Sequence, residues 1–201
     1  MGKFKAALLQ TLVYEDKEKN VNDAVELIEN AAREGADIAV LPEMFCCPYS
    51  TSYFREYGEE EGGFAYEKIS FAAKKSGIYV VAGTVPELED NNVYNTSYVF
   101  DRKGNKIAKH RKMHLFDIDV EGGQYFKESD VLTPGRDVTV FDTEFCKMGL
   151  GVCYDIRFPE LSRLMALEGA EVMIYPGAFN MTTGPAHWEL NFRSRALDNQ
   201  I

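Results

Sequence analysis

Apolar residues follow two different periods along this chain, and together these periods predict an α/β protein. Several short runs are apolar at almost every position, which is typical of strands covered on both faces. We expect strands within residues 4–10, 38–41, 78–83, 93–100, 107–109, 138–141 and 148–152. Between them, apolar residues recur at helical spacing and stop at a glycine. The predicted helices contain residues 21–32, 69–73 and 161–165, and they end at Gly35, Gly77 and Gly169.

The segments between these elements have the composition of turns. Residues 101–105 carry charges and a glycine, which predicts a hairpin turn, and residues 129–137 predict a loop.

One motif occurs twice and indicates an internal duplication. Glu-Gly-Ala-Asp at 34–37 leads through four apolar residues to Pro42, and Glu-Gly-Ala-Glu at 168–171 leads in the same way to Pro176. Each copy follows a predicted strand and helix. We therefore expect two similar strand–helix–strand halves that face each other. The alternative is chance, because helix–glycine–strand–proline is a common order in α/β proteins.

Two candidate catalytic residues lie directly after predicted strands. Residues 145–160 predict a short buried strand that stops at Cys153, followed by a turn and a helix that begins at Pro159. Glu43 follows the strand that closes the first half. Sites of α/β proteins lie at such strand ends. The alternatives are that the cysteine is a small buried apolar residue and that the carboxylate is solvated.

A nucleophilic thiol needs a base and a charge partner. Burial beside Met44 and Phe45 would make Glu43 basic enough to take the proton of Cys153. Lys112 lies in a basic stretch, 109–114, of an acidic chain. A lysine beside the thiol would lower the thiol pKa and hold the oxyanion of a tetrahedral intermediate. The alternative for Lys112 is an exposed turn.

Composition limits the class of protein. The chain has 201 residues with 45% hydrophobic content, which suits one domain over residues 1–201. Its net charge of −10 argues against nucleic acid and anionic membranes as partners and favours a small molecule. The four cysteines form no CxxC pair, so we expect a reducing compartment, the cytoplasm, rather than disulfides or zinc. The apolar run at 6–9 is too short for a signal peptide, and no span approaches the roughly 20 apolar residues of a membrane helix.

Three motifs together resemble the Glu–Lys–Cys triad of the nitrilase (carbon–nitrogen hydrolase) superfamily. They are Leu-Pro-Glu-Met-Phe around Glu43, His-Arg-Lys-Met-His-Leu-Phe-Asp around Lys112, and Gly-Val-Cys-Tyr-Asp-Ile-Arg-Phe-Pro-Glu around Cys153. The resemblance covers essentially the whole chain. Residues 115–120 and 175–190 look like the omega-amidase branch, which hydrolyses the terminal amide of 2-oxoglutaramate and 2-oxosuccinamate.

The resemblance implies a four-layer α-β-β-α sandwich, which the duplicated motif independently favours, and a thioester mechanism without cofactor or metal. Cys153 would attack the amide carbonyl, and Glu43 would move the proton to the departing ammonia. Lys112 and the backbone N–H of Tyr154 would stabilise the oxyanion. Glu128 matches a second glutamate that positions the lysine and the base in the family.

The matching pocket segments contain five candidate substrate contacts: Tyr49, Arg157, Phe179, Thr182 and Thr183. Arg157 is a cation that could pair with a substrate carboxylate. Equally, it could bind Asp155 or Glu160 and hold the turn.

Chains of the family continue beyond the segment that residues 193–201 resemble, into further strands. A sandwich that lacks these strands would expose apolar faces and an unpaired sheet edge. We therefore expect a C-terminally truncated form of the fold, which is either a fragment of a longer protein or is covered by a partner. The helices after Cys153 and around residues 188–197 resemble the surface by which family members dimerise, so a homodimer or higher homo-oligomer is expected.

Other functions remain open at this point. N-carbamoyl amino-acid hydrolysis and deaminated-glutathione hydrolysis are alternatives within the superfamily. A zinc hydrolase could use His110 and His114, and a papain-like enzyme could pair Cys153 with His114 or His187. A protein that keeps the fold without turnover and serves only in interactions is the alternative from another class.

Overall fold

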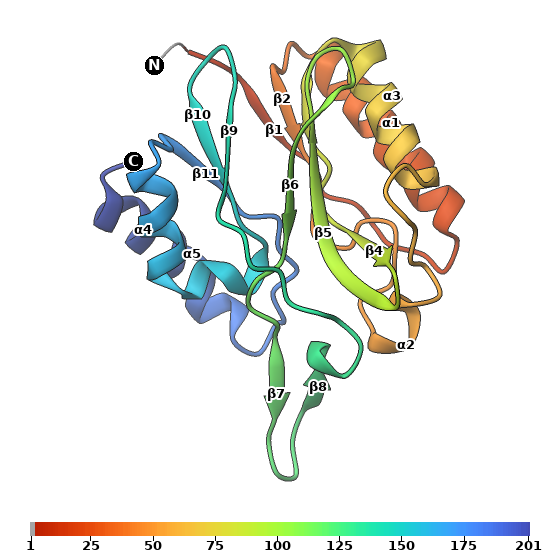
Figure 1. Cartoon of the computed structure of the whole chain (residues 1–201), viewed down its shortest axis with the longest axis vertical. Helices are drawn as coiled ribbons and strands as arrows, with labels where there is room; N and C mark the ends of the chain where they lie inside the picture. Colours follow the sequence, from red (N-terminus) through yellow and green to blue (C-terminus); the bar gives the residue numbers. More distant parts are fainter. Residues whose placement is uncertain (1–2) are drawn as a thin grey trace.

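The computed structural model describes residues 3–201, which form four layers in the order α-β-β-α (Figure 1). Two sheets face each other in the middle. Helices α1 (Lys17–Arg33) and α3 (Phe64–Ser76) cover the outer face of one sheet. Helices α4 (Pro159–Leu167) and α5 (Gly184–Asn199) cover the other. The predicted sandwich is confirmed.

The first sheet has the strand order β1-β2-β3-β5-β4, and β6 pairs with β5. Its strands are β1 (Ala6–Leu8), β2 (Ile38–Val40), β3 (Tyr79–Val81), β4 (Val85–Glu89), β5 (Asn92–Phe100) and β6 (Lys106–Arg111). The first three are parallel neighbours, whereas β5 runs antiparallel to β3, β4 and β6. The predicted turn at 101–105 joins β5 to β6.

The second sheet is smaller and has the order β11-β10-β9. It contains β9 (Thr139–Asp142), β10 (Lys147–Leu150) and β11 (Val172–Ile174). A separate hairpin of β7 (Asp117–Asp119) and β8 (Tyr125–Lys127) extends away from the layers (Figure 1). Short helical turns complete the described chain: α2 (Thr51–Phe54), η1 (Glu128–Asp130) and η2 (Cys153–Arg157).

Apolar cores lie between all four layers, which explains why the strands are apolar without alternation. The core between the sheets includes Ile38, Val40, Val81, Val99, Phe141, Met148 and Leu150. The first sheet and its helices bury Val21, Ala24, Ile28, Ile69, Ala72, Val80 and Phe100. The second sheet and its helices bury Ile156, Leu161, Met165, Ala170 and Tyr175.

Both halves have the predicted strand–helix–strand form. In the first half, β1 leads through α1 to the parallel strand β2, with Ala7 opposite Ala39. In the second half, β10 leads through α4 to the parallel strand β11, with Gly149 opposite Met173. Glu43 therefore follows the end of β2, and Cys153 follows the end of β10.

Local chemistry fixes where these helices begin. The Asp16 side chain accepts a hydrogen bond from the Lys19 N–H at 2.9 Å and caps α1. Pro159 occupies the first turn of α4, where no intrahelical N–H bond is lost. Of these two residues, Pro159 is the one that the sequence pattern identifies as a helix start.

Several elements were not predicted because their signals are weak. Strand β4 contains Pro86 and becomes exposed toward its end at Glu89, and strands β7 and β8 have three residues each. The predicted loop at 129–137 begins with the η1 turn. These elements depend on tertiary contacts rather than on a periodic pattern.

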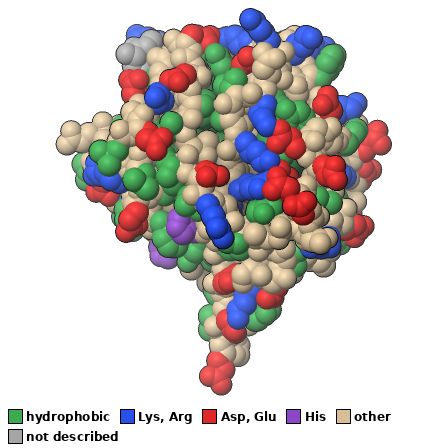
Figure 2. All heavy atoms as spheres, viewed as in Figure 1, with side chains coloured by type: hydrophobic (Ala, Val, Ile, Leu, Met, Phe, Trp, Pro, Cys, Tyr) green, Lys and Arg blue, Asp and Glu red, His purple; other side chains and the backbone are tan. Residues whose placement is uncertain are grey.

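The face around β6 carries charges of both signs (Figure 2). Lys109 and Arg111 project from β6 and pair with Glu87 of β4, whose carboxylate is 1% exposed. Glu87 also accepts a hydrogen bond from Thr96 at 2.7 Å. This network joins β4, β5 and β6.

Two sheet edges remain apolar and uncovered. No described strand pairs with the outer edge of β1 or of β11. A groove of about 560 Å³ lies along both edges, and its lining includes Leu8, Ile174 and Trp188. Leu8 is 79% exposed. This is the exposed apolar surface that the sequence led us to expect.

Within residues 3–201, no helix is both long enough and apolar enough to cross a membrane. All four cysteines are free thiols.

The segment after β3 holds Glu43 in place from both sides. The Thr84 N–H donates to the Pro42 carbonyl at 3.2 Å, and the Met44 N–H donates to the Thr84 hydroxyl at 2.8 Å. The preceding Gly83 has a φ of +52°, and a Cβ at this position would lie 2.0 Å from the Pro42 oxygen. Only glycine permits this approach.

We expect Gly83→Ala to lower the free energy of unfolding by at least about 2 kcal/mol, because it adds a backbone clash to a strained φ. Gly62→Ala is the matched control, since Gly62 has a φ of +90° but open space around its Cβ position. The control should cost only about 1 kcal/mol. Urea denaturation measures both, and equal losses would contradict the proposed contact.

Candidate active site

Cys153 lies on a sharp turn between β10 and α4. Its φ is +45°, a left-handed conformation that non-glycine residues rarely adopt and that is found preferentially at functional sites. The Cys153 N–H donates to the Pro176 carbonyl at 2.8 Å, which ties the turn to the end of β11. Gly151 allows the turn to pass close to Tyr175, because a Cβ there would lie 2.4 Å from the ring.

Glu43 is buried at the end of β2, with 3% of its surface exposed. Its Oε1 atom accepts hydrogen bonds from Lys112 Nζ at 2.9 Å and from Asn95 Nδ2 at 2.8 Å. Its Oε2 atom accepts one from the backbone N–H of Ala178, 2.9 Å away after β11. Glu43 therefore contacts both sheets.

Lys112 is fully buried just beyond β6. Its ammonium group donates to Glu43 and to Glu128, each at 2.9 Å. Burial alone would lower the Lys112 pKa, but the two carboxylates and the nearby Cys153 raise it well above the ordinary value. Lys112 therefore stays protonated.

Glu128 is held in the same cluster by η1. Burial raises its pKa, with Lys112 acting in the opposite direction and Glu43 adding to the rise. Its Oε2 atom accepts from the Phe116 N–H at 2.6 Å. The hydroxyl of Tyr49 donates to the Oε1 atom at 2.5 Å and lies 3.3 Å from Glu43. Tyr49 thus belongs to the charged cluster as well as to the pocket wall.

The Cys153 thiol is protonated at neutral pH. Burial raises its pKa well above the ordinary value, and the Glu43 carboxylate raises it further, whereas Lys112 lowers it. The resting arrangement is a neutral thiol beside the buried Glu43–Lys112–Glu128 cluster.

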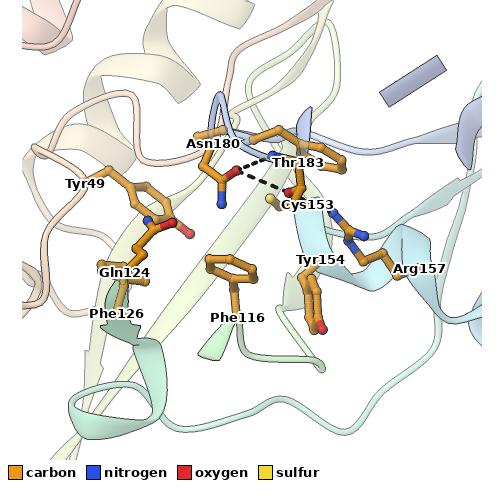
Figure 3. A pocket seen from close by; sticks show the side chains of 11 residues that line it. Tyr49, Phe116, Gln124, Phe126, Cys153, Tyr154, Arg157, Asn180 and Thr183 are labelled. Atoms are coloured by element: carbon orange, nitrogen blue, oxygen red, sulfur yellow. Dashed lines mark hydrogen bonds between the residues drawn. The ribbon is translucent and has the colours of Figure 1, made fainter. Parts of the chain in front are cut away.

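Cys153 opens into a pocket of about 270 Å³ (Figure 3). Aromatic rings and amides dominate its wall, which is lined by Tyr49, Phe116, Gln124, Phe126, Cys153, Tyr154, Arg157, Ala178, Phe179, Asn180 and Thr183. Such a volume suits a small molecule, and the single cation in the wall indicates an anionic group on that molecule.

Arg157 provides this cation. Its guanidinium group contacts His187 Nδ1 at 2.8 Å and lies 5.5 Å from the rings of Tyr154 and Phe179. Its Nε atom is buried without a hydrogen-bond partner. Among the ion pairs formed within residues 3–201, none includes Arg157, so the predicted alternative of a pair with Asp155 or Glu160 is not observed.

Nearly all the sequence-predicted site residues meet at this pocket or in the cluster behind it. Thr182 is the exception. It is exposed and lies outside the pocket lining, and its N–H donates to Asn180 Oδ1 at 3.1 Å. The predicted contact at Thr182 therefore does not lie in the pocket wall, whereas Asn180 does.

Sequence reasoning also missed several site residues. Asn95 binds the candidate base, and its signal was a polar residue within an otherwise buried strand. Phe116, Gln124 and Phe126 reach the pocket from the β7–β8 hairpin and its approach. Their positions depend on a hairpin that the sequence did not predict.

The three histidines bind neither a metal cluster nor Cys153 in the described chain, as the two alternative enzymes would require. His110 and His114 both contact Asp155, at 3.1 and 2.8 Å, and His187 contacts Arg157. In the described part of the chain, no three His, Cys, Asp or Glu side chains are grouped to hold a metal ion. The pairing of Cys153 with His114 or His187 is not observed.

A pocket-facing thiol beside a buried carboxylate has the two parts that covalent catalysis by a cysteine needs, a nucleophile and an adjacent base. A family model described as carbon-nitrogen hydrolase matches residues 5–201. The chain belongs to the carbon–nitrogen hydrolase (nitrilase) family.

Similar proteins support this membership. The chain is 52% identical over 201 residues to the omega-amidase NIT2 of Xenopus tropicalis, covering all of this chain and 73% of that protein. It is 52% identical over 200 residues to nitrilase homolog 2 of Dictyostelium discoideum, covering 98% of this chain and 61% of that one. The crystal structure of Saccharomyces cerevisiae Nit3, a member of branch 10 of the nitrilase superfamily, superposes with a TM-score of 0.89 at 44% identity. That match covers 98% of this chain and 73% of Nit3.

The charge relation between Glu43 and Cys153 gives a prediction. Glu43→Gln removes a negative charge that raises the thiol pKa, so alkylation of Cys153 by iodoacetamide should begin at a lower pH. Hydrolysis of an amide should fall by about 10²- to 10⁴-fold, because the base is lost.

Alkylation is followed by intact mass over a pH series, with Cys153→Ala as the blank for the other thiols. An alkylation midpoint that stays in place or moves to higher pH would show that Glu43 does not control this thiol.

Proposed function

We propose that this chain is an omega-amidase that hydrolyses the terminal amide of small 2-oxo dicarboxylic acid monoamides, such as 2-oxoglutaramate and 2-oxosuccinamate, to the acid and ammonia. The observation that carries the proposal is the Cys153 thiol beside the Glu43–Lys112–Glu128 cluster, in a small pocket whose wall has one cation. The similarity to proteins named omega-amidase, at about half identity over the whole chain, supports the same activity.

Substrate binding uses the amphipathic wall of the pocket. The Arg157 guanidinium pairs with the substrate carboxylate, and it has donor capacity for this because no carboxylate of the described chain occupies it. Asn180 and Thr183 provide polar contacts nearby, while Phe116, Phe126 and Phe179 exclude water. The reacting amide then lies at Cys153.

The first chemical step forms a thioester. Glu43 Oε1 is already filled by hydrogen bonds from Lys112 and Asn95, so Oε2 has the free lone pair that takes the thiol proton. The sulfur attacks the amide carbonyl, and the oxyanion is stabilised by Lys112 and by the backbone N–H of Tyr154 in the first turn of η2. Glu43 returns the proton to the nitrogen, the carbon–nitrogen bond breaks and ammonia leaves.

The second step releases the acid. Glu43 takes a proton from a water molecule that attacks the thioester carbonyl, and the same oxyanion contacts act again. The carbon–sulfur bond breaks, and the thiol regains the proton. Glu128 and Tyr49 do not move protons in this scheme. They hold Lys112 and Glu43 in position.

We further propose that the protein is a homodimer or higher homo-oligomer and that it acts in the cytoplasm. Four leucines on the outer surface of α4 and α5 are exposed, from 47% to 78%: Leu164, Leu167, Leu190 and Leu197. Such a group of apolar side chains is suited to a second copy of the chain. The four free thiols agree with a reducing compartment.

Ammonia release from 2-oxoglutaramate tests the activity. We expect release by the chain and none by Cys153→Ala, because the thioester requires the sulfur. N-carbamoyl-β-alanine and glutamine are run alongside, and deaminated glutathione is added as a fourth substrate. Faster turnover of one of these would replace the substrate assignment. A folded, monodisperse chain that releases ammonia from none of them would contradict the proposed activity and favour a role in interactions alone.

The role of Arg157 predicts a selective loss. Arg157→Gln should lower kcat/KM for 2-oxoglutaramate by about 10- to 100-fold, since a hydrogen bond to a charged group contributes about 1.5–3 kcal/mol. A neutral amide such as butyramide should be affected little. Arg193→Gln is the matched control, because Arg193 lies on α5 and its side chain is 79% exposed. Equal losses for the charged and the neutral substrate would show that Arg157 holds the turn rather than the carboxylate.

A further inference from the structure

Asp155 is a fully buried carboxylate two residues after the nucleophile, and the scheme above gives it no role. It does not line the substrate pocket. Its two oxygens nevertheless accept five hydrogen bonds of 3.2 Å or shorter, all from N–H donors. The pKa of Asp155 is held well below its ordinary value, because the hydrogen bonds from His110, His114 and Val152 outweigh the effect of burial.

These five donors belong to two separate parts of the chain. One is the backbone N–H of Val152, the residue before Cys153, at 2.9 Å from Oδ2. The others surround Lys112. They are the His110 ring at 3.1 Å, the Met113 N–H at 3.2 Å, and the N–H and ring of His114 at 2.9 and 2.8 Å.

The two parts belong to different sheets. Lys112 follows β6 of the first sheet, and Cys153 follows β10 of the second. Between the sheets lies an apolar core, whose contacts have little directional preference. Hydrogen bonds to one carboxylate are directional, so they fix the distance and orientation between the two strand ends.

We infer that Asp155 is a positioning residue that sets the placement of Lys112 relative to the Cys153 sulfur. It acts through the backbone of the residues beside Lys112 and before Cys153 and does not touch the substrate. His110 and His114 are part of the same device. The His110 ring is held on its other side by Thr139 at 2.9 Å, and the His114 ring stacks on Phe158 at 3.6 Å.

Asp155→Asn is the direct test because it preserves size and removes an acceptor. Oδ1 accepts from the backbone of Met113 and His114, and Oδ2 accepts from the backbone of Val152. In either orientation the new amide nitrogen therefore faces a backbone N–H, and one of the two segments must move away.

The expected result is a displaced lysine. Because Lys112 lowers the thiol pKa, its displacement should move the alkylation midpoint of Cys153 to higher pH, opposite to the shift expected for Glu43→Gln. For the proposed amidase activity, kcat should fall by about 10²-fold, as misplacement by about 1 Å can cost this much, with KM little changed.

Glu87→Gln is the matched control, since Glu87 is a buried carboxylate that does not line the pocket and that binds the side chains of Thr96, Lys109 and Arg111 rather than backbone N–H groups. It should lose stability but keep the alkylation profile and kcat of the unmodified chain. If Asp155→Asn resembles Glu87→Gln in both measurements, the positioning role is wrong. The alkylation profile needs no substrate, so it tests Asp155 even if the proposed amidase activity fails.

A second variant decides the matter if Asp155→Asn does not fold. His114→Phe removes one donor to Asp155 and keeps an aromatic ring on Phe158. A smaller shift of the alkylation midpoint in the same direction supports the inference, and an unchanged midpoint overturns it.

Discussion

The structure of this site depends on one buried cation, the ammonium group of Lys112. Two carboxylates, Glu43 and Glu128, lie within hydrogen-bonding distance of it. Removing one member of such a buried pair typically costs about 3–5 kcal/mol, because a charge is left uncompensated. Burial, together with the Glu43 carboxylate, also keeps the neighbouring Cys153 thiol neutral until a substrate reacts with it. The buried cluster therefore stabilises the folded site and helps to set the resting state of the nucleophile.

The duplicated fold brings these groups together. In each half, one strand ends where the two sheets face each other, and a reacting group follows it. Glu43 follows β2 in the first half, and Cys153 follows β10 in the second. Lys112 follows the carboxyl end of β6. Because β5 is antiparallel to both β3 and β6, strand β6 runs in the same direction as β2 and ends at the same side of the sheet. Hydrogen bonds between the two halves run from Ala178 to Glu43 and from the Lys112 segment to Asp155. They fix the relative position of the strand ends, which the apolar core alone does not determine.

Much of this could be predicted from the sequence, because the strongest signals are local. The helices with clear periodicity, the repeated glycine–strand–proline motif and the motifs around Glu43, Lys112 and Cys153 can all be identified within a few residues. The remaining features could not be predicted, because they depend on residues far apart in the chain. Asn95 reaches Glu43 across 52 positions, and Tyr49 reaches Glu128 across 79. The sequence near each of these residues does not indicate its partner.

The central claim is that Cys153 becomes acylated during amide hydrolysis. The most direct test is to mix the protein with excess 2-oxoglutaramate, quench it with acid during turnover and measure the mass of the peptide that contains Cys153. The account predicts a mass increase equal to the acyl group, which disappears when hydroxylamine cleaves the thioester. Steady release of ammonia with no acyl group on this peptide at any quench time, while a control thioester survives the same work-up, would contradict it.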